Sequence, residues 1–221
     1  MVPGPAWRRC GVPRLPDRRI PRMVKPMPPA YETDPTEMPS SPVLLKWNVV
    51  VTAREAGQRR LRRVLRPLVR LHRSGFRNVF VGQIDDLEAF FAAVAELRER
   101  RPRLDAWLGK ILPIERTFAV EIDRFAAQLE EASAPLLVRL EGHSFHVRVE
   151  RRGHKGLINT HATERALGEV LYTRLEACGQ RPVVAFADPD MVVAVEILGN
   201  VCGIGLVTRA LRQQFPFVKI D

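Results

Sequence analysis

The chain has 221 residues, of which 46% are hydrophobic and 27% are charged. This balance is typical of a folded protein and excludes a wholly disordered one. The 35 Lys and Arg residues exceed the 25 Asp and Glu residues and give a formal net charge of +10. So basic a chain favours a polyanionic partner, RNA or DNA before an anionic membrane surface. The Arg-rich codon usage of GC-rich genomes is the alternative explanation.

The cysteines and the apolar runs of the sequence indicate the cellular compartment. Cys10, Cys178 and Cys202 form no C-x-x-C pair, which argues against a zinc knuckle or a disulfide framework and favours a reducing compartment. The longest apolar stretch, residues 191–207, is interrupted by polar and glycine residues, whereas a membrane helix needs about 20 apolar residues. We therefore expect a cytoplasmic protein without a membrane segment.

The first 42 residues contain 11 of the 18 prolines and show no hydrophobic periodicity. Such a segment cannot bury enough surface to offset its ordering entropy, so residues 1–42 are predicted to be a disordered Pro/Arg-rich tail. A transit peptide or an upstream start codon is the alternative. Without the tail the chain keeps 28 basic and 21 acidic side chains, or +7, so the basic character belongs to the folded part.

Residues 43–110 predict a small ferredoxin-like domain. An apolar run up to Val51 has strand length, and apolar residues at helical spacing follow it until Gly75. Pro67 predicts a kink or a break in that helix. Residues 77–84 form the next expected strand, and Asp85 or Asp86 can cap a helix that ends before Pro102. Strand, helix, strand and helix, followed by an extended stretch at 111–120, is the order of a ferredoxin-like unit.

Arginines gather on the polar face of the first predicted helix. A phosphate contact and a solvated helix face are equally good explanations, because nothing in the pattern recognises a base or a shape. The residues concerned are Arg59, Arg60, Arg62, Arg63, Arg66, Arg70 and Arg73.

Residues 111–221 predict helices packed on a mixed sheet, which makes the whole chain α+β, an α/β sandwich. Residues 144–150 alternate strictly between apolar and polar, as in a half-buried strand. Thr160 or Thr163 can cap the helix that follows, Gly179 can end it, and Cys178 is expected on its core face. After a short strand at 183–186, an Asp-Pro-Asp turn leads into a hairpin of residues 191–198 and 201–208.

The predicted strand leads into a basic loop whose glycines let backbone amides approach an anion. This loop is the densest candidate phosphate site in the chain. The RNA-binding surface is predicted to comprise Arg148, Arg151, Arg152, Gly153, His154, Lys155 and Gly156, with Arg174, Arg209 and Lys219 as weaker candidates.

Several sequence blocks in order resemble a THUMP domain over residues 111–221: ERRGHKG, then ER-x-LG, then DPD-x-VV-x-VEI-x-G and CGIGLVTR. The resemblance implies a grip on the acceptor stem and CCA end of tRNA, which are read by shape, backbone charge and base stacking. The ending TRALRQQFPFVKID is similar to stand-alone THUMP proteins that act as adaptors in tRNA cytidine acetylation. The resemblance therefore implies a non-catalytic adaptor that presents tRNA to a separate modifying enzyme, possessing neither a cofactor nor a small-molecule substrate.

A search for an active site finds no Walker loop, G-x-S-x-G elbow or H-E-x-x-H helix. His143 and His146 point to opposite faces of a strand, so a metal site there is disfavoured. Asp188 and Asp190 are better explained as turn residues than as a pair of catalytic carboxylates. Arg165 is a candidate to form an ion pair with them. No catalytic and no metal-binding residue is predicted. A general RNA-binding chaperone or an undetected small RNA-modifying enzyme remains the alternative.

Overall fold

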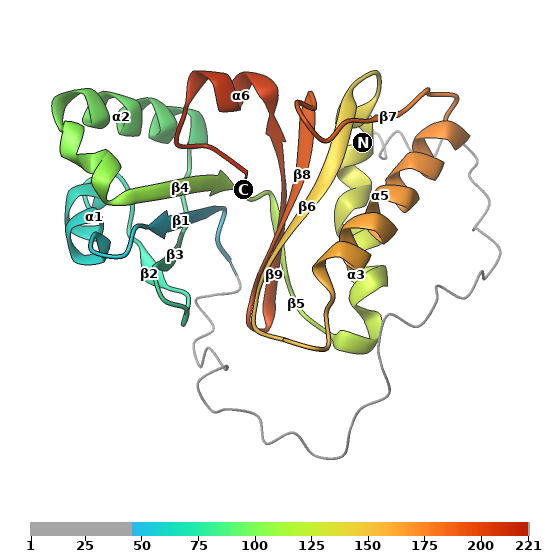
Figure 1. The fold of residues 1–221 in the computed structure, drawn as a ribbon, viewed down its shortest axis with the longest axis horizontal. Helices are drawn as coiled ribbons and strands as arrows, with labels where there is room; N and C mark the ends of the chain where they lie inside the picture. Colours follow the sequence, from blue (N-terminus) through green and yellow to red (C-terminus); the bar gives the residue numbers. More distant parts are fainter. Residues whose placement is uncertain (1–45, 221) are drawn as a thin grey trace, which may run out of the picture.

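The computed structural model of the chain describes residues 46–220, which form two β-sheets with helices (Figure 1). The predicted tail over residues 1–42 lies outside the described residues. Within them, no helix is both long enough and apolar enough to cross a membrane.

The first sheet is antiparallel, with the strand order β2-β3-β1-β4. Its elements follow one another as β-α-β-β-α-β, the order expected of a ferredoxin-like unit. They are β1 (Val49–Ala53), α1 (Gln58–Leu65), β2 (His72–Arg73), β3 (Val79–Gly82), α2 (Leu87–Arg100) and β4 (Leu108–Pro113). A short 3-10 helix, Pro102–Ala106, separates α2 from β4.

Pro67 shortens the first helix. The helix α1 ends at Leu65, whose carbonyl accepts hydrogen bonds from the amides of Leu68 and Val69. The break predicted at Pro67 is confirmed, because Pro67 has no amide hydrogen and its ring clashes with the preceding turn, and the helix does not resume before Gly75. The next helix begins as predicted, since the Asp86 side chain accepts a hydrogen bond from the Ala89 amide at 2.9 Å.

The second sheet is mixed and has the order β5-β9-β8-β6-β7, with β6 parallel to both of its neighbours. This confirms the expected α+β class with helices on a mixed sheet. The strands are β5 (Arg116–Ala119), β6 (Ser144–Arg152), β7 (Val183–Val184), β8 (Met191–Leu198) and β9 (Val201–Thr208). The helices are α3 (Phe125–Ser133), α4 (Leu137–Leu140), α5 (Thr160–Ala177) and α6 (Arg209–Gln214), with 3-10 turns at Ile122–Arg124 and Ala134–Leu136.

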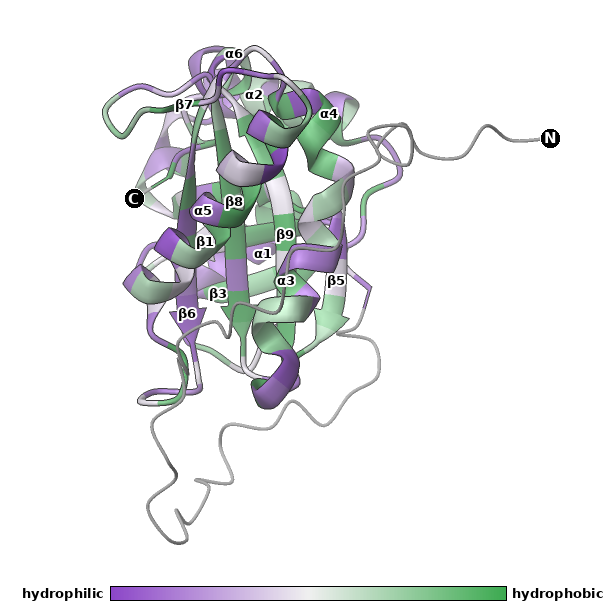
Figure 2. Cartoon of the chain, turned by 90° about the vertical axis from the view of Figure 1, so that its right-hand side faces the viewer, coloured by the Kyte–Doolittle hydropathy of each residue, from purple (hydrophilic) through white to green (hydrophobic). Residues whose placement is uncertain are grey.

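The second sheet is the middle layer of the molecule. Figure 1 shows α3 and α5 on one face and the first unit on the other. Alternate residues of β8 divide accordingly: Val193, Val195 and Ile197 pack beneath the helices, whereas Val192 and Ala194 join the core of the first unit. Strands β8 and β9 are mostly apolar in Figure 2, because both of their faces are covered.

The first unit approaches the second sheet closely at Gly203 and Gly205 in β9. A Cβ atom on Gly203 would lie 2.4 Å from the ring of Trp47, and one on Gly205 would lie 2.5 Å from the carbonyl oxygen of Pro113. Both positions therefore exclude larger side chains. This explains the two glycines as packing features of a strand.

The division of the chain at residue 110 stays a prediction. In the structure β4 extends the first sheet to Pro113, and the chain end returns to the first unit. Phe215, Phe217 and Val218 lie in its core, and the Ile111 amide donates to the Phe217 carbonyl at 2.9 Å. The last residues of the chain therefore stabilise its first sheet.

Two local predictions in the second unit need correction. The N-cap of α5 is Asn159, whose side chain accepts a hydrogen bond from the Ala162 amide at 3.0 Å, and neither Thr160 nor Thr163 takes this role. Asn caps a helix as well as Thr does, because its oxygen reaches the same amides. Cys178, which was expected in the core, is only half-buried at the C-cap.

Candidate nucleic-acid interface

The strand β6 runs further than expected and ends in a tight basic loop. Arg151 and Arg152 belong to the strand, so the loop itself comprises residues 153–156. Gly153 has φ of 95° and His154 has φ of 50°, in the left-handed region that favours glycine. A Cβ on Gly153 would also lie 3.1 Å from the Cα of Gly199. Gly153 is therefore required both by backbone conformation and by space.

Arg152 is paired with two acids in the structure, and its place in the RNA-binding surface stays a prediction. Its guanidinium lies 2.9 Å from a Glu196 carboxylate oxygen and 3.0 Å from one of Glu150. The Lys110 ammonium pairs with Glu150 and lies 3.9 Å from Glu196. Lys110 and Glu196 are buried, so these four residues, the buried charge cluster, neutralise one another between β4, β6 and β8.

The loop keeps three basic side chains that can serve an anion. Lys155 is exposed, and His154 is half-buried. Arg151 is half-buried too, and its guanidinium donates to the carbonyl of Gly153 beside it. Together these side chains and the loop amides present positive charge at the end of β6.

Arg148 covers the exposed edge of β6. Strand β7 pairs only with Ser144 and Phe145, and beyond that point Glu164 of α5 accepts a hydrogen bond from the Val149 amide at 2.9 Å. The Arg148 guanidinium lies 3.6 Å from the same carboxylate, and its side chain is 38% exposed. The helix motif ER-x-LG thus supplies a carboxylate that satisfies a strand edge, and Arg148 remains partly available.

The Asp-Pro-Asp turn is held by Arg209, which corrects the expected role of Arg165. Arg209 lies 2.9 Å from Asp188 and 2.6 Å from Asp190, whereas Arg165 is exposed. Asp190 also accepts hydrogen bonds from the amide and hydroxyl of Ser144, which lower the pKa of its carboxyl group. The turn acids therefore have a structural role.

The weaker candidates are not gathered at the loop. Arg209 lies at the turn before β8, at the opposite end of the second sheet from the loop. Arg174 of α5 pairs with Glu130 of α3 on the helical face. Lys219 is exposed and its charge acts on Asp105 of the first unit.

The structure brings a second basic surface to the loop. We call the exposed arginines of α1 and of the segment up to β3 the arginine surface; they are Arg59, Arg60, Arg62, Arg63, Arg66, Arg70, Arg73 and Arg77. Phe76, in the turn between Arg73 and Arg77, contacts Gly153: its ring lies 3.6 Å from the position that a Cβ there would occupy. The turn between Arg73 and Arg77, at one edge of the arginine surface, thus lies next to the loop.

Neutralising contacts on the arginine surface are weak. Arg77 lies 3.7 Å from Glu55, and both side chains are more than 70% exposed, a geometry that contributes little in water. Arg60 stacks 5.6 Å from the Trp107 ring, which positions the cation without cancelling its charge. The spacing of arginines in the sequence indicated this helix face, but nothing in the sequence indicated that the turn at Phe76 lies beside the loop at residues 153–156.

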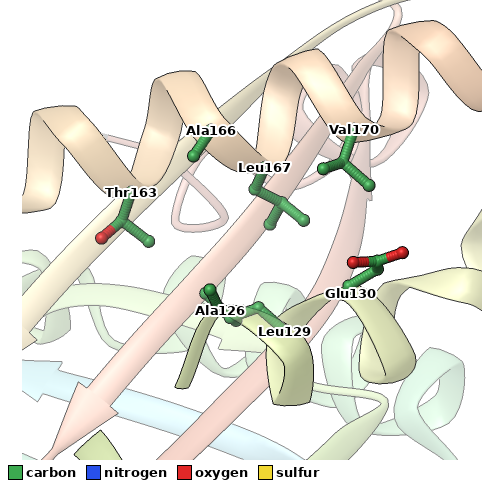
Figure 3. Close-up of a pocket in the computed structure, with 7 residues that line it drawn as sticks. All are labelled: Ala126, Leu129, Glu130, Thr163, Ala166, Leu167 and Val170. Carbon is green, nitrogen blue, oxygen red and sulfur yellow. The ribbon is translucent and has the colours of Figure 1, made fainter. Parts of the chain in front are cut away.

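The carboxylate of a crevice between α3 and α5 and the Nδ1 atom of His146 are both engaged by neighbouring groups. Figure 3 shows the crevice between α3 and α5, lined by Ala126, Leu129, Glu130, Thr163, Ala166, Leu167 and Val170. Its carboxylate, Glu130, is paired with Arg174. Within residues 46–220 no group of three or more His, Cys, Asp or Glu side chains could hold a metal ion. His146 instead faces the carbonyl of Ala185, with its Nδ1 3.1 Å away.

Comparisons with known proteins agree with this architecture. No curated protein sequence matches the chain. Among solved structures, TrmN from Thermus thermophilus is 18% identical, with a TM-score of 0.53 over 72% of this chain and 44% of that one. PH1313 from Pyrococcus horikoshii is 11% identical, with a TM-score of 0.50 over 73% and 54%. A 4-thiouridine synthetase bound to RNA and ATP is 14% identical, with a TM-score of 0.51 over 73% and 41%. The chain thus spans about half the length of each.

These neighbours overturn the prediction that the protein is not an enzyme. The solved structures that share its fold include a synthetase with bound ATP, so the fold occurs in catalytic proteins and gives no ground for excluding catalysis. The prediction depended on the resemblance to stand-alone THUMP proteins and on missing motifs, and both are weak arguments because function resides in sites rather than in folds.

The family comparison covers the second sheet and its helices. Residues 121–207 match the THUMP domain, within the range 111–221 over which the sequence resembles it. The matched segment contains β6, the basic loop, α5, the Asp-Pro-Asp turn, and the β8–β9 hairpin as far as Val207. The chain therefore contains a THUMP domain, a domain of RNA-binding proteins that take part in tRNA modification.

Proposed function

We propose that the chain binds tRNA at its acceptor stem and CCA end and holds it for base modification, in the cytoplasm. The observation that supports this most is the basic loop of the THUMP domain lying beside the arginine surface. A duplex end with an unpaired terminus suits such a surface, because it is recognised through phosphate charge and shape. The proposal includes a second polypeptide that acts on the bound tRNA, and a cytidine acetyltransferase is the first to test.

Binding of intact tRNA and of the same tRNA trimmed of its CCA end tests the specificity. We expect trimming to lower the affinity, because contacts to the unpaired terminus are lost while the stem contacts remain. Fluorescence anisotropy at a fixed salt concentration measures both. Equal affinities would contradict acceptor-end recognition and favour a general RNA-binding protein.

Replacement of Arg151 and Lys155 by Ala tests the surface itself. We expect weaker tRNA binding and a log affinity versus log salt plot that is flatter by about one unit for each lost phosphate contact. Arg116→Ala is the matched control, since Arg116 is exposed on β5 at the opposite edge of the second sheet. The Arg73→Ala/Arg77→Ala pair should flatten the plot as well.

The salt series also has an outcome that contradicts this placement. If the loop variant and Arg116→Ala change affinity and salt dependence equally, the chain does not use the loop as a specific phosphate site. If only the Arg73→Ala/Arg77→Ala pair has an effect, the RNA lies on the first unit alone.

A further inference from the structure

Phe186 exposes an aromatic ring to solvent. Its relative exposure is 79%, and among the described residues the other large hydrophobic side chains that are exposed are all valines. Two of these valines, Val183 and Val184, precede it in β7. An exposed aromatic ring beside apolar side chains is characteristic of a surface that binds a ligand or a partner molecule.

The backbone around Phe186 is held at both ends. Before it, the Ala185 amide donates to the Phe145 carbonyl at 3.1 Å. After it, Asp190 is bound by Ser144, and the Arg212 guanidinium donates to the carbonyl of Pro189. The ring is therefore presented from a fixed segment, which reduces the entropy lost when a ligand stacks on it.

A second ring and the cation of Arg148 lie beside Phe186. The His146 ring lies 5.9 Å from the Phe186 ring with an angle of 37° between their planes. Its Nδ1–H donates to the Ala185 carbonyl when the ring is neutral, which leaves Nε2 as an acceptor. Arg148 follows two residues later on the same face of β6. Aromatic rings beside cations are the usual means of holding unpaired nucleotides.

We propose that Phe186, supported by His146, is a stacking site for an unpaired nucleobase, with Arg148 positioned for an adjoining phosphate. The proposal rests on the RNA-binding function proposed above and adds a contact at the opposite end of β6 from the basic loop. At about 3.3 Å per residue, His146 and Arg152 are roughly 20 Å apart along the strand. The two sites thus belong to different parts of one RNA. A protein ligand is less well supported, because β7 offers only two residues for strand pairing.

The test uses the full chain and two RNA hairpins that share one stem. One hairpin is blunt, and the other carries a short unpaired 3′ tail with 2-aminopurine at its end. We expect Phe186→Leu to weaken binding of the tailed hairpin by about 5- to 150-fold, and to leave the blunt hairpin unaffected, because stacking on an aromatic ring is lost. Phe186→Trp should retain the affinity and the quenching of 2-aminopurine fluorescence.

Val138→Ala is the matched control, because Val138 is an exposed apolar side chain on α4, 52% accessible. Unchanged binding of the tailed hairpin by Phe186→Leu would overturn the stacking site. If the Arg151→Ala/Lys155→Ala variant still weakened binding of both hairpins, the proposed function would stand without the stacking site. An equal loss of affinity of Phe186→Leu for both hairpins would also overturn the stacking site, as would equal affinity of the wild-type chain for the tailed and blunt hairpins. Failure of the wild-type chain to bind either hairpin would overturn both proposals.

Discussion

His146 is a half-buried side chain whose environment favours the neutral ring. Burial lowers its pKa most, and the positive charges of Arg148 and Arg212 lower the pKa further. The hydrogen bond to the Ala185 carbonyl and the negative charge of Glu164 act in the opposite direction but do not cancel this effect. The neutral form therefore predominates near pH 7, which keeps Nε2 an acceptor.

The lowered pKa of His146 predicts a pH dependence of stability. In the unfolded chain the ring takes up a proton below about pH 6.5, whereas the folded chain resists it to lower pH. The free energy of unfolding should therefore fall as the pH drops below about 6.5, and His146→Gln should reduce that fall. Urea denaturation at about pH 7.5 and about pH 5.5 measures it. An equal fall in the variant would mean that other groups cause the pH dependence.

At the scale of elements, α5 completes the edge of β6 through one carboxylate. Glu164 accepts the Val149 amide hydrogen where β7 no longer pairs with the strand. Unpaired strand edges expose backbone groups to wrong partners. The side chain therefore joins a helix to a strand edge that the short β7 cannot cover.

Loss of that carboxylate should destabilise the fold. We expect Glu164→Ala to lower the free energy of unfolding by about 1–3 kcal/mol, because the Val149 amide loses its acceptor. Glu164→Gln keeps an oxygen there and should recover part of the loss. Glu169→Ala is the control, since Glu169 is exposed on the same helix. Thermal or urea denaturation measures the stability of each variant. Equal stability of Glu164→Ala and Glu169→Ala would refute a stabilising role of the Glu164 carboxylate.

Local signals determined most elements. Pro67 and Asp86 set the end of α1 and the start of α2 through the absence of one amide hydrogen and the presence of one carboxylate. Strict alternation placed β6, but its end was misplaced. The alternation stops at Glu150 and so predicts Arg151 and Arg152 in the loop, whereas their pairing with Ile197 and Leu198 extends the strand. Register with a strand 46 residues away is not visible in local spacing.

At the scale of the whole molecule, the buried charge cluster joins the two units. Lys110 comes from the first sheet, and Glu150, Arg152 and Glu196 come from the second. Two acids and two bases balance, so removing one leaves a buried charge without its full compensation. The cluster therefore makes the packing of the two units depend on the complete set.

A double-mutant cycle tests this dependence. We expect Glu196→Leu to lower the free energy of unfolding by about 3–5 kcal/mol. Lys110→Met should partly restore stability in that background, because it removes the opposite charge. The exposed pair of Arg124 and Glu121, 3.4 Å apart, is the control cycle, with an expected coupling of about 0–1 kcal/mol. Additive effects of Glu196→Leu and Lys110→Met in urea denaturation would show that the cluster does not act as a unit.

By itself the sequence determined the α+β class, the basic character of the folded part, the hairpin after the Asp-Pro-Asp turn and the THUMP resemblance, because each depends on residues close together in the chain. Only the tertiary structure decided which basic side chains remain available. Arg152 is neutralised by Glu196, 44 residues away, and Phe76 brings the arginine surface to Gly153. Charge is a property of composition, but its availability depends on neighbours that meet only when the two sheets pack together.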